Sequence, residues 1–163
     1  MNDSTAPRYY FDANALFKYY RDENGSLNIR RLVSNSTVPV LLSSLTLLEC
    51  FGVVMKYYRK KYLKKKDVSK IFKRIRRDSG ITDTSTRPFR IISMPDGAFR
   101  LAQNILLQQA CTYQIGSNDA LHLAIMKQFD INENSFIMVT SDQSMKSVCE
   151  KICTPVYDPE KDV

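Results

Sequence analysis

Histidine and cysteine, which form most zinc sites, are scarce and poorly spaced in this chain. His122 is the only histidine, and none of the four cysteines has the paired spacing that marks zinc ligands. The pattern excludes a zinc-binding domain. The remaining interpretation of the cysteines is that all four are buried, reduced thiols; they are Cys50, Cys111, Cys149 and Cys153.

Long apolar runs are also lacking. The most apolar stretch, Val38 to Met55, is barely long enough to span a bilayer and contains Glu49 among several hydroxyl residues. The N-terminal sequence lacks the basic start and continuous apolar core of a signal peptide. We therefore expect a soluble, cytoplasmic protein with no membrane partner.

Low-complexity tracts, internal repeats and obvious linkers are absent as well. Of the 163 residues, 44% are hydrophobic, and the five Gly and six Pro are typical of a compact globular protein. A chain of this length can bury a core without disulfides or a structural metal. We predict one domain over residues 1–163.

Positive charge is concentrated in one segment. Twelve of the 24 Lys and Arg residues lie between Lys56 and Arg77, where only Asp67 opposes them. This segment carries +11 and the whole chain +7, so the remainder carries −4. The concentration favours a polyanionic partner, and interleaved tyrosines favour nucleic acid over a membrane surface. The residues assigned to RNA binding are Lys56, Arg59, Lys60, Lys61 and Lys64.

An ordinary solvated helix face is the alternative for this segment. Apolar residues recur at helical spacing from Val68 to Ile75, so the intervening Lys and Arg side chains would simply face solvent. Under either interpretation we expect the basic segment, at about 45–78, to be helical.

Strands alternate with helices along the chain. We predict strands at 8–11, 38–43, 89–93, 135–140 and 155–157. We predict helices at 13–20, 27–35, 45–62, 67–77, 98–111, 119–129 and 144–152, with a loop at 82–88. This alternation predicts an α/β protein, a three-layer α/β/α sandwich around a mainly parallel sheet.

Four acidic residues stand beside or inside apolar stretches: Asp12, Glu49, Asp119 and Asp142. Asp12 and Asp142 follow the predicted strands at 8–11 and 135–140. Glu49 lies one turn into the helix that follows the predicted strand at 38–43. In open parallel sheets the functional crevice lies beyond the carboxyl ends of the strands, so these acids can meet there. Ionised carboxylates are rarely buried unless they are paired, and a divalent cation is the obvious compensating charge.

Helix capping is the alternative for each acid taken alone. Asp12 and Asp142 fit helix N-caps, and Asp119 fits the positive end of a helix dipole. Thr46 and Glu49 have the T-x-x-E spacing of a capping box. Glu49 fits this alternative least well. If the helix begins one turn away from the start that a capping box requires, Glu49 lies among apolar residues with no basic residue nearby in the sequence.

The order of the motifs resembles the PIN domain family. Asp12 and Asn14 follow the first strand, S-S-L-T-L-L-E ends at Glu49, D-A-L-H-L-A begins at Asp119, and T-S-D follows an apolar strand. The resemblance extends from about Tyr9 to Tyr157. Within the family the chain is most similar to the VapC-type toxin ribonucleases of prokaryotic type II toxin–antitoxin pairs.

This resemblance implies that Asp12, Glu49, Asp119 and Asp142 hold Mg²⁺ or Mn²⁺ and form the catalytic set. Asn14 and Thr140 would be polar supporting residues. Carboxylate oxygens suit both ions, which keep waters and bind phosphate oxygens in their remaining positions. The implied activity is divalent-metal-dependent endonucleolytic cleavage of RNA phosphodiester bonds.

Two further residues near the acids have weaker assignments. His122 lies one turn after Asp119, and we interpret it as a packing or supporting residue and not as a general base. Ser141 stands beside Asp142, where its hydroxyl would orient carboxylates or bind phosphate, although a turn role is also open.

The resemblance also implies protein partners. A small antitoxin would block the acidic pocket, and the helices at 45–62 and 67–77 would bind the antitoxin or form a homodimer, with Tyr57, Tyr58 and Phe72 exposed for contact. Two other functions stay open: a PIN nuclease that matures ribosomal or transfer RNA, and a non-catalytic RNA-binding or scaffold protein with the same fold.

Overall fold

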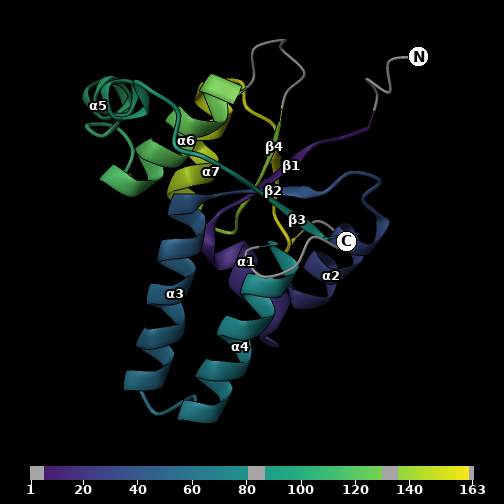
Figure 1. Ribbon diagram of the computed structural model, residues 1–163. Helices are drawn as coiled ribbons and strands as arrows, with labels where there is room; N and C mark the ends of the chain where they lie inside the picture. The colour runs from purple at the N-terminus through teal and green to yellow at the C-terminus, as the bar shows by residue number, and fades with distance from the viewer. Residues whose placement is uncertain (1–5, 81–86, 130–135, 162–163) are drawn as a thin grey trace.

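Five short parallel strands form the central sheet of the computed structural model, which describes residues 6–80, 87–129 and 136–161 (Figure 1). The order across the sheet is β3-β2-β1-β4-β5, and every neighbouring pair is parallel. The strands are β1 (Tyr9–Phe11), β2 (Val40–Ser43), β3 (Phe89–Ile92), β4 (Ile137–Val139) and β5 (Val156–Tyr157).

Helices cover both faces of this sheet. The helices are α1 (Ala13–Tyr20), α2 (Ser26–Asn35), α3 (Ser44–Arg59), α4 (Lys65–Asp78), α5 (Ala98–Gln109), α6 (Ser117–Phe129) and α7 (Gln143–Lys151). In Figure 1, α5, α6 and α7 gather on one side of the strands and α1 and α2 on the other, with α3 and α4 projecting as a hairpin. The predicted α/β/α sandwich is confirmed.

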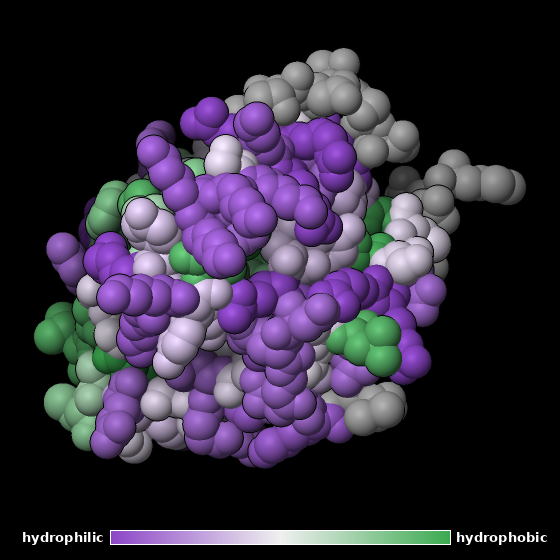
Figure 2. Space-filling view, turned by 90° about the horizontal axis from the view of Figure 1, so that it is seen from below, coloured by the Kyte–Doolittle hydropathy of each residue, from purple (hydrophilic) through white to green (hydrophobic). Residues whose placement is uncertain are grey.

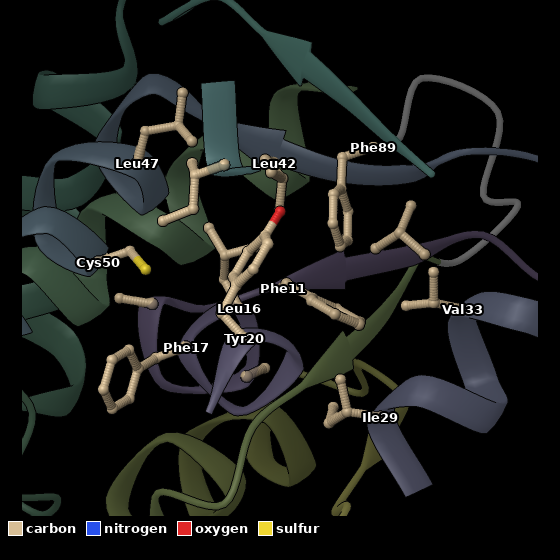
Figure 3. Close-up of a cluster of buried hydrophobic side chains, with 14 of the residues drawn as sticks. Phe11, Leu16, Phe17, Tyr20, Ile29, Val33, Leu42, Leu47, Cys50 and Phe89 are labelled. Atoms are coloured by element: carbon tan, nitrogen blue, oxygen red, sulfur yellow. The ribbon is translucent and has the colours of Figure 1, made fainter. Parts of the chain in front are cut away.

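Alternation along the strands explains the two layers. Phe11 and Val139 pack in one apolar cluster with α1 to α4, while the adjacent Tyr10 and Met138 pack in a second cluster with α5 to α7. Side chains alternate between the two faces of a strand, so β1 and β4, buried on both faces, have continuous apolar sequences. Figure 3 shows the first cluster, in which Phe11 and Phe89 lie with side chains of α1 and α2.

The predicted element boundaries agree with the structure to within a few residues. Helix α1 has the predicted bounds, whereas α3 ends at Arg59 and not at Tyr62. The predicted loop at 82–88 lies largely outside the described residues.

The prediction for the cysteines is half wrong. Cys50 and Cys149 are buried, but Cys111 and Cys153 are exposed. Each exposed cysteine lies in the turn that follows a helix, and Cys153 has a left-handed backbone (φ 56°). All four are free thiols.

Amphipathic packing joins α3 and α4. Ile71 and Ile75 of α4 are buried, and Phe72 packs against Phe51 of α3 with ring centroids 4.5 Å apart. The lysines and arginines of the hairpin face outward, and Figure 2 shows the end toward which it projects to be largely hydrophilic. Among the described residues, no helix is long and apolar enough to cross a membrane.

Candidate active site

The chain reverses its path across the sheet at β1. From this central strand it proceeds outward through β2 and β3, and it then returns to β4 and β5 on the other side. Clefts of parallel sheets open at such a switch point, beyond the carboxyl ends of the strands. Asp12 directly follows β1, and Asp142 lies three residues beyond β4. The topology therefore places both acids at this edge.

A pocket of about 350 Å³ lies at this edge and is lined by all four predicted acids. Helix α3 contributes Glu49 and α6 contributes Asp119, so the four carboxylates come from four different parts of the chain. A second pocket of about 480 Å³, lined by Tyr9, Arg31 and Tyr157 among others, contains no acidic residue in its lining. The smaller pocket is the candidate active site because it alone of the two gathers carboxylates.

Asp12 is the most deeply buried of the four acids. Its Oδ1 accepts a hydrogen bond of 2.7 Å from the backbone N–H of Ala15, so it is the N-cap of α1. Burial raises the pKa of Asp12; hydrogen bonds from Ala15 and Thr140 oppose the shift, and the charge of Asp142 adds to it. The capping and pocket roles therefore coexist in this one side chain.

Asp119 and Asp142 also combine a cap with a place in the pocket. Asp119 Oδ2 accepts a hydrogen bond of 2.8 Å from the Gly116 N–H, and Asp142 Oδ1 accepts one of 2.8 Å from the Met145 N–H. Partial burial raises the pKa of Asp119, and the nearby charges of Asp142 and Glu49 raise it further. These carboxylates thus repel one another across the pocket.

Glu49 has no capping role. The N-cap of α3 is Ser43, which forms a reciprocal capping box with Thr46. The Glu49 carboxylate instead contacts α6, where Oε1 accepts from Asn118 Nδ2 and Oε2 pairs with His122 Nε2, each at 2.6 Å. Burial disfavours its charge, but His122 and Asn118 outweigh burial and lower the pKa of Glu49.

Tyr10 of β1 contacts the histidine that holds Glu49. His122 is buried, and its Nδ1 shares a hydrogen bond of 2.7 Å with the Tyr10 hydroxyl, which also donates to Ser43 Oγ at 2.9 Å. The sequence interpretation of His122 as a supporting residue agrees with this geometry. Sequence reasoning missed Tyr10 and Asn118. The available signal for Tyr10 was a phenol in a buried strand, whose hydroxyl needs a partner.

The predicted supporting residues lie in different places. Asn14 lines the pocket. Thr140 is fully buried and accepts a 3.0 Å hydrogen bond from the Asp142 N–H, which fixes the turn after β4. Ser141 is not among the residues that line the pocket. Its hydroxyl oxygen is buried and has no hydrogen-bond partner of good geometry among the described residues.

Only part of the predicted basic set reaches the pocket. Lys56 and Arg59 line it from α3, whereas Lys60, Lys61 and Lys64 are exposed beyond the end of that helix and are not part of its lining. The predicted apolar contact surface also needs correction. Tyr57 packs on Phe17 at 4.9 Å between ring centroids and Phe72 on Phe51, so the exposed apolar residues of this region are Leu48, Tyr58 and Tyr62.

The donor chemistry fits Mg²⁺ or Mn²⁺, because four carboxylates face one pocket and two of them have a raised pKa that a cation would reverse. Within residues 6–80, 87–129 and 136–161, however, no three His, Cys, Asp or Glu side chains form a compact metal-binding group. Both oxygens of the Glu49 carboxylate are hydrogen-bonded, one to Asn118 and one to His122.

The model of the PIN domain matches residues 9–151 of this sequence. The chain belongs to the PIN domain family. The resemblance inferred from the motif order is thereby confirmed. No curated protein sequence matches the chain significantly.

Solved structures of toxin–antitoxin proteins share this PIN fold. FitAcB from Neisseria gonorrhoeae has a TM-score of 0.66 at 19% identity, covering 94% of this chain and 99% of that chain. VapC20 from Mycobacterium tuberculosis, a toxin that cleaves the sarcin–ricin loop, has a TM-score of 0.62 at 12% identity, covering 86% and 94%. VapBC2 from Rickettsia felis, bound to a promoter DNA fragment, has a TM-score of 0.57 at 19% identity, covering 91% and 96%. At these identities the likeness establishes the fold.

Proposed function

We propose that this PIN protein is a divalent-metal-dependent endoribonuclease and the toxin of a toxin–antitoxin pair. The observation that carries the proposal is the pocket in which Asp12, Glu49, Asp119 and Asp142 meet at the switch point of the sheet. Membership of the PIN family supports nuclease chemistry, and the similar toxin structures support the toxin role. The presence of all four acids in one pocket argues against a non-catalytic scaffold, because helix capping accounts for Asp12, Asp119 and Asp142 but not for Glu49.

In this proposal the four carboxylates hold Mg²⁺ or Mn²⁺. The bound ion supplies positive charge for the phosphate oxygens and acidifies a water for attack on phosphorus. Asp12 and Asp142 present their carboxylates from helix N-termini, whose backbone N–H groups keep them oriented. His122 and Asn118 hold Glu49 ionised, and Lys56 and Arg59 attract the RNA backbone.

Purified protein incubated with cellular RNA tests the activity. We expect cleavage with Mn²⁺ or Mg²⁺, no cleavage with EDTA, and no cleavage by the Asp119→Asn variant, which keeps an acceptor for the Gly116 N–H. Cleavage that survives both EDTA and the substitution would contradict the proposal. A substrate preference follows from mapping new 5′ ends in cellular RNA after brief induction of the wild type and of this variant.

Toxicity separates a toxin from an RNA-maturation enzyme. Expression of the wild type should arrest growth, and Asp12→Ala should relieve the arrest because it removes the most buried carboxylate of the pocket. Growth that is unaffected by wild-type protein with proven nuclease activity would favour the maturation role over the toxin role.

The proposed protein partners are an antitoxin and a second copy of this chain. One similar structure is a toxin–antitoxin complex from Klebsiella pneumoniae, which supports an antitoxin partner for this chain; FitAB and VapBC2 were each solved bound to a DNA fragment. The hairpin of α3 and α4 exposes Leu48 and Tyr62, with 69% and 64% of their surfaces accessible. We expect the solution mass to be that of a dimer and Leu48→Glu with Tyr62→Glu to reduce it to that of a monomer. An unchanged mass would place the interface elsewhere.

A further inference from the structure

Gly52 lies in the interior of α3 and lines the acidic pocket. Glycine in the middle of a helix lowers stability relative to alanine, because it loses more backbone freedom on folding. Such a position calls for a reason. Either the backbone conformation or a close neighbour must exclude a side chain, or something outside the chain must need the space.

The structure of the chain itself gives no such reason. A Cβ atom built on Gly52 meets no atom within 4 Å. Gly52 is also not among the described glycines with a positive φ, which are Gly25, Gly80 and Gly97. Alanine would therefore fit at position 52 without a clash and without backbone strain. The open space above this residue belongs to the pocket.

Position 52 lies on the same strip of α3 as the charged residues of the pocket. Glu49 precedes it by three residues, Lys56 follows it by four, and Arg59 follows it by seven, and all line the pocket. At the helical rise, these residues lie about 4.5, 6 and 10 Å from Gly52 along the axis. The strip therefore leads from a carboxylate of the acidic set, across a gap without a side chain, to two cations.

We propose that Gly52 is a substrate-clearance residue, where one nucleotide of single-stranded RNA next to the cleaved phosphodiester passes over the bare helix backbone. Lys56 and Arg59 then bind the phosphates that follow. This inference rests on the proposed nuclease function and adds the place of the flanking nucleotide. A pocket of about 350 Å³ takes in a single nucleotide, which an unpaired strand or loop presents with its base unstacked.

Charge favours RNA over a protein segment as the occupant. Beyond Gly52, the charged side chains of α3 that line the pocket are Lys56 and Arg59, and both are cations. A chain of regularly spaced phosphates satisfies both in succession, and the carboxylates at the other end suit a phosphate only with a cation between them. This order gives the path of the RNA strand along α3, with the cleaved phosphate at the acids and the flanking nucleotides over Gly52 and Lys56.

Two substitutions at position 52 test the inference. Gly52→Ala should raise the melting temperature by about 2 °C through its helix propensity. Gly52→Leu should fill the gap and weaken binding of a fluorescein-labelled single-stranded RNA oligonucleotide by about tenfold, the scale of one lost base contact. Fluorescence anisotropy in Ca²⁺ at low salt measures this affinity with a cation at the carboxylates but without the Mg²⁺ or Mn²⁺ needed for cleavage. In Mn²⁺, Gly52→Leu should raise KM more than it lowers kcat.

Asn104→Leu is the matched control, since Asn104 is an exposed residue in the interior of α5 and does not line the pocket. It should bind the RNA with wild-type affinity. Wild-type RNA affinity and KM in Gly52→Leu, with cleavage by the wild type intact, would overturn the clearance role alone. Loss of a protein partner by Gly52→Leu without loss of RNA affinity would also overturn it. If the wild type neither binds nor cleaves RNA, the proposed function fails as well.

Discussion

His122 Nε2 lies 2.6 Å from Glu49 Oε2, so the only histidine of the chain holds the one acid of the pocket that caps no helix. The three other acids are oriented by backbone N–H groups of their own or adjacent turns. Glu49 depends on side chains from α6 instead. Its position is therefore the one most easily changed by substitution.

Replacing His122 should reduce activity through Glu49. In His122→Ala, Glu49 keeps only Asn118 and its pKa rises, so Mn²⁺ affinity and cleavage rate should fall by about 10–100-fold, as for other partners of metal-binding residues. Calorimetric titration with Mn²⁺ measures the affinity. Tyr10→Phe keeps the ring in the core while removing one partner of His122, and it should have a smaller effect. Equal losses in both variants would contradict a role centred on Glu49.

Removing the charge of Asp119 should stabilise the metal-free protein at neutral pH. The pKa of Asp119 is raised by burial and by Asp142, so its contribution favours folding below the ordinary pKa of 3.8 and turns unfavourable as pH rises through the folded value. In EDTA at pH 7, Asp119→Asn should therefore melt at a higher temperature than the wild type. The difference should vanish below about pH 4. A lower melting temperature at pH 7 would mean that the carboxylate is not under repulsion.

The C-terminal segment should become less stabilising in acid. Lys18 is buried, and its Nζ donates to Glu160 Oε1 at 2.7 Å, which lowers the pKa of Glu160 below its ordinary value of 4.5. This contribution is complete above pH 4.5 and is lost as pH falls through the lowered pKa. Glu160→Gln should lower the melting temperature at pH 7, and this difference should shrink as the pH falls below 4.5 and through the lowered pKa.

An exposed ion pair provides the control for that experiment. Arg30 pairs with Asp22, whose side chain is 89% exposed, and surface pairs of this kind contribute about 0–1 kcal/mol. Asp22→Asn should therefore have a smaller effect than Glu160→Gln at pH 7. If Asp22→Asn and Glu160→Gln lowered the melting temperature equally at pH 7, burial of Lys18 would not strengthen its ion pair with Glu160.

Lys56 and Arg59 should account for part of the salt dependence of RNA binding. Each phosphate contact with a single strand contributes about 0.7 to the slope of log affinity against log salt concentration. Lys56→Ala and Arg59→Ala should each reduce the slope by about that amount, because both side chains line the pocket. Lys70→Ala, an exposed position on α4 outside the pocket lining, should leave it unchanged. Equal changes in all three would indicate a diffuse attraction.

The strand ends and the pocket acids could be predicted because they depend on local sequence. Each of the two strands is a short apolar run that ends where polar residues begin. Placing Asp12 and Asp142 in one cleft then required only the rule that the cleft lies beyond the carboxyl ends of parallel strands. Glu49 was separable from a capping box because it stands among apolar residues with no basic residue nearby in the sequence, and the structure shows that Ser43 is the cap.

The contacts that orient Glu49 could not be predicted because they depend on the packing of α6. Tyr10 and His122 are 112 positions apart, and only the placement of α6 over β1 brings them together. The exposed cysteines were mispredicted for a related reason. Whether a thiol is buried depends on where a helix ends, and α5 ends at Gln109, which leaves Cys111 in the following turn.

Calorimetric titration with Mn²⁺ of the wild type and four single variants, Asp12→Asn, Glu49→Gln, Asp119→Asn and Asp142→Asn, tests the central claim most directly. If the acids act as one set, the wild type binds Mn²⁺ and every variant loses most of that affinity, with RNA cleavage lost in parallel. The carboxyl-to-amide changes keep size and capping acceptors, so folding should persist. Wild-type Mn²⁺ affinity in any one variant would remove that residue from the set, and no binding by the wild type would contradict the claim as a whole.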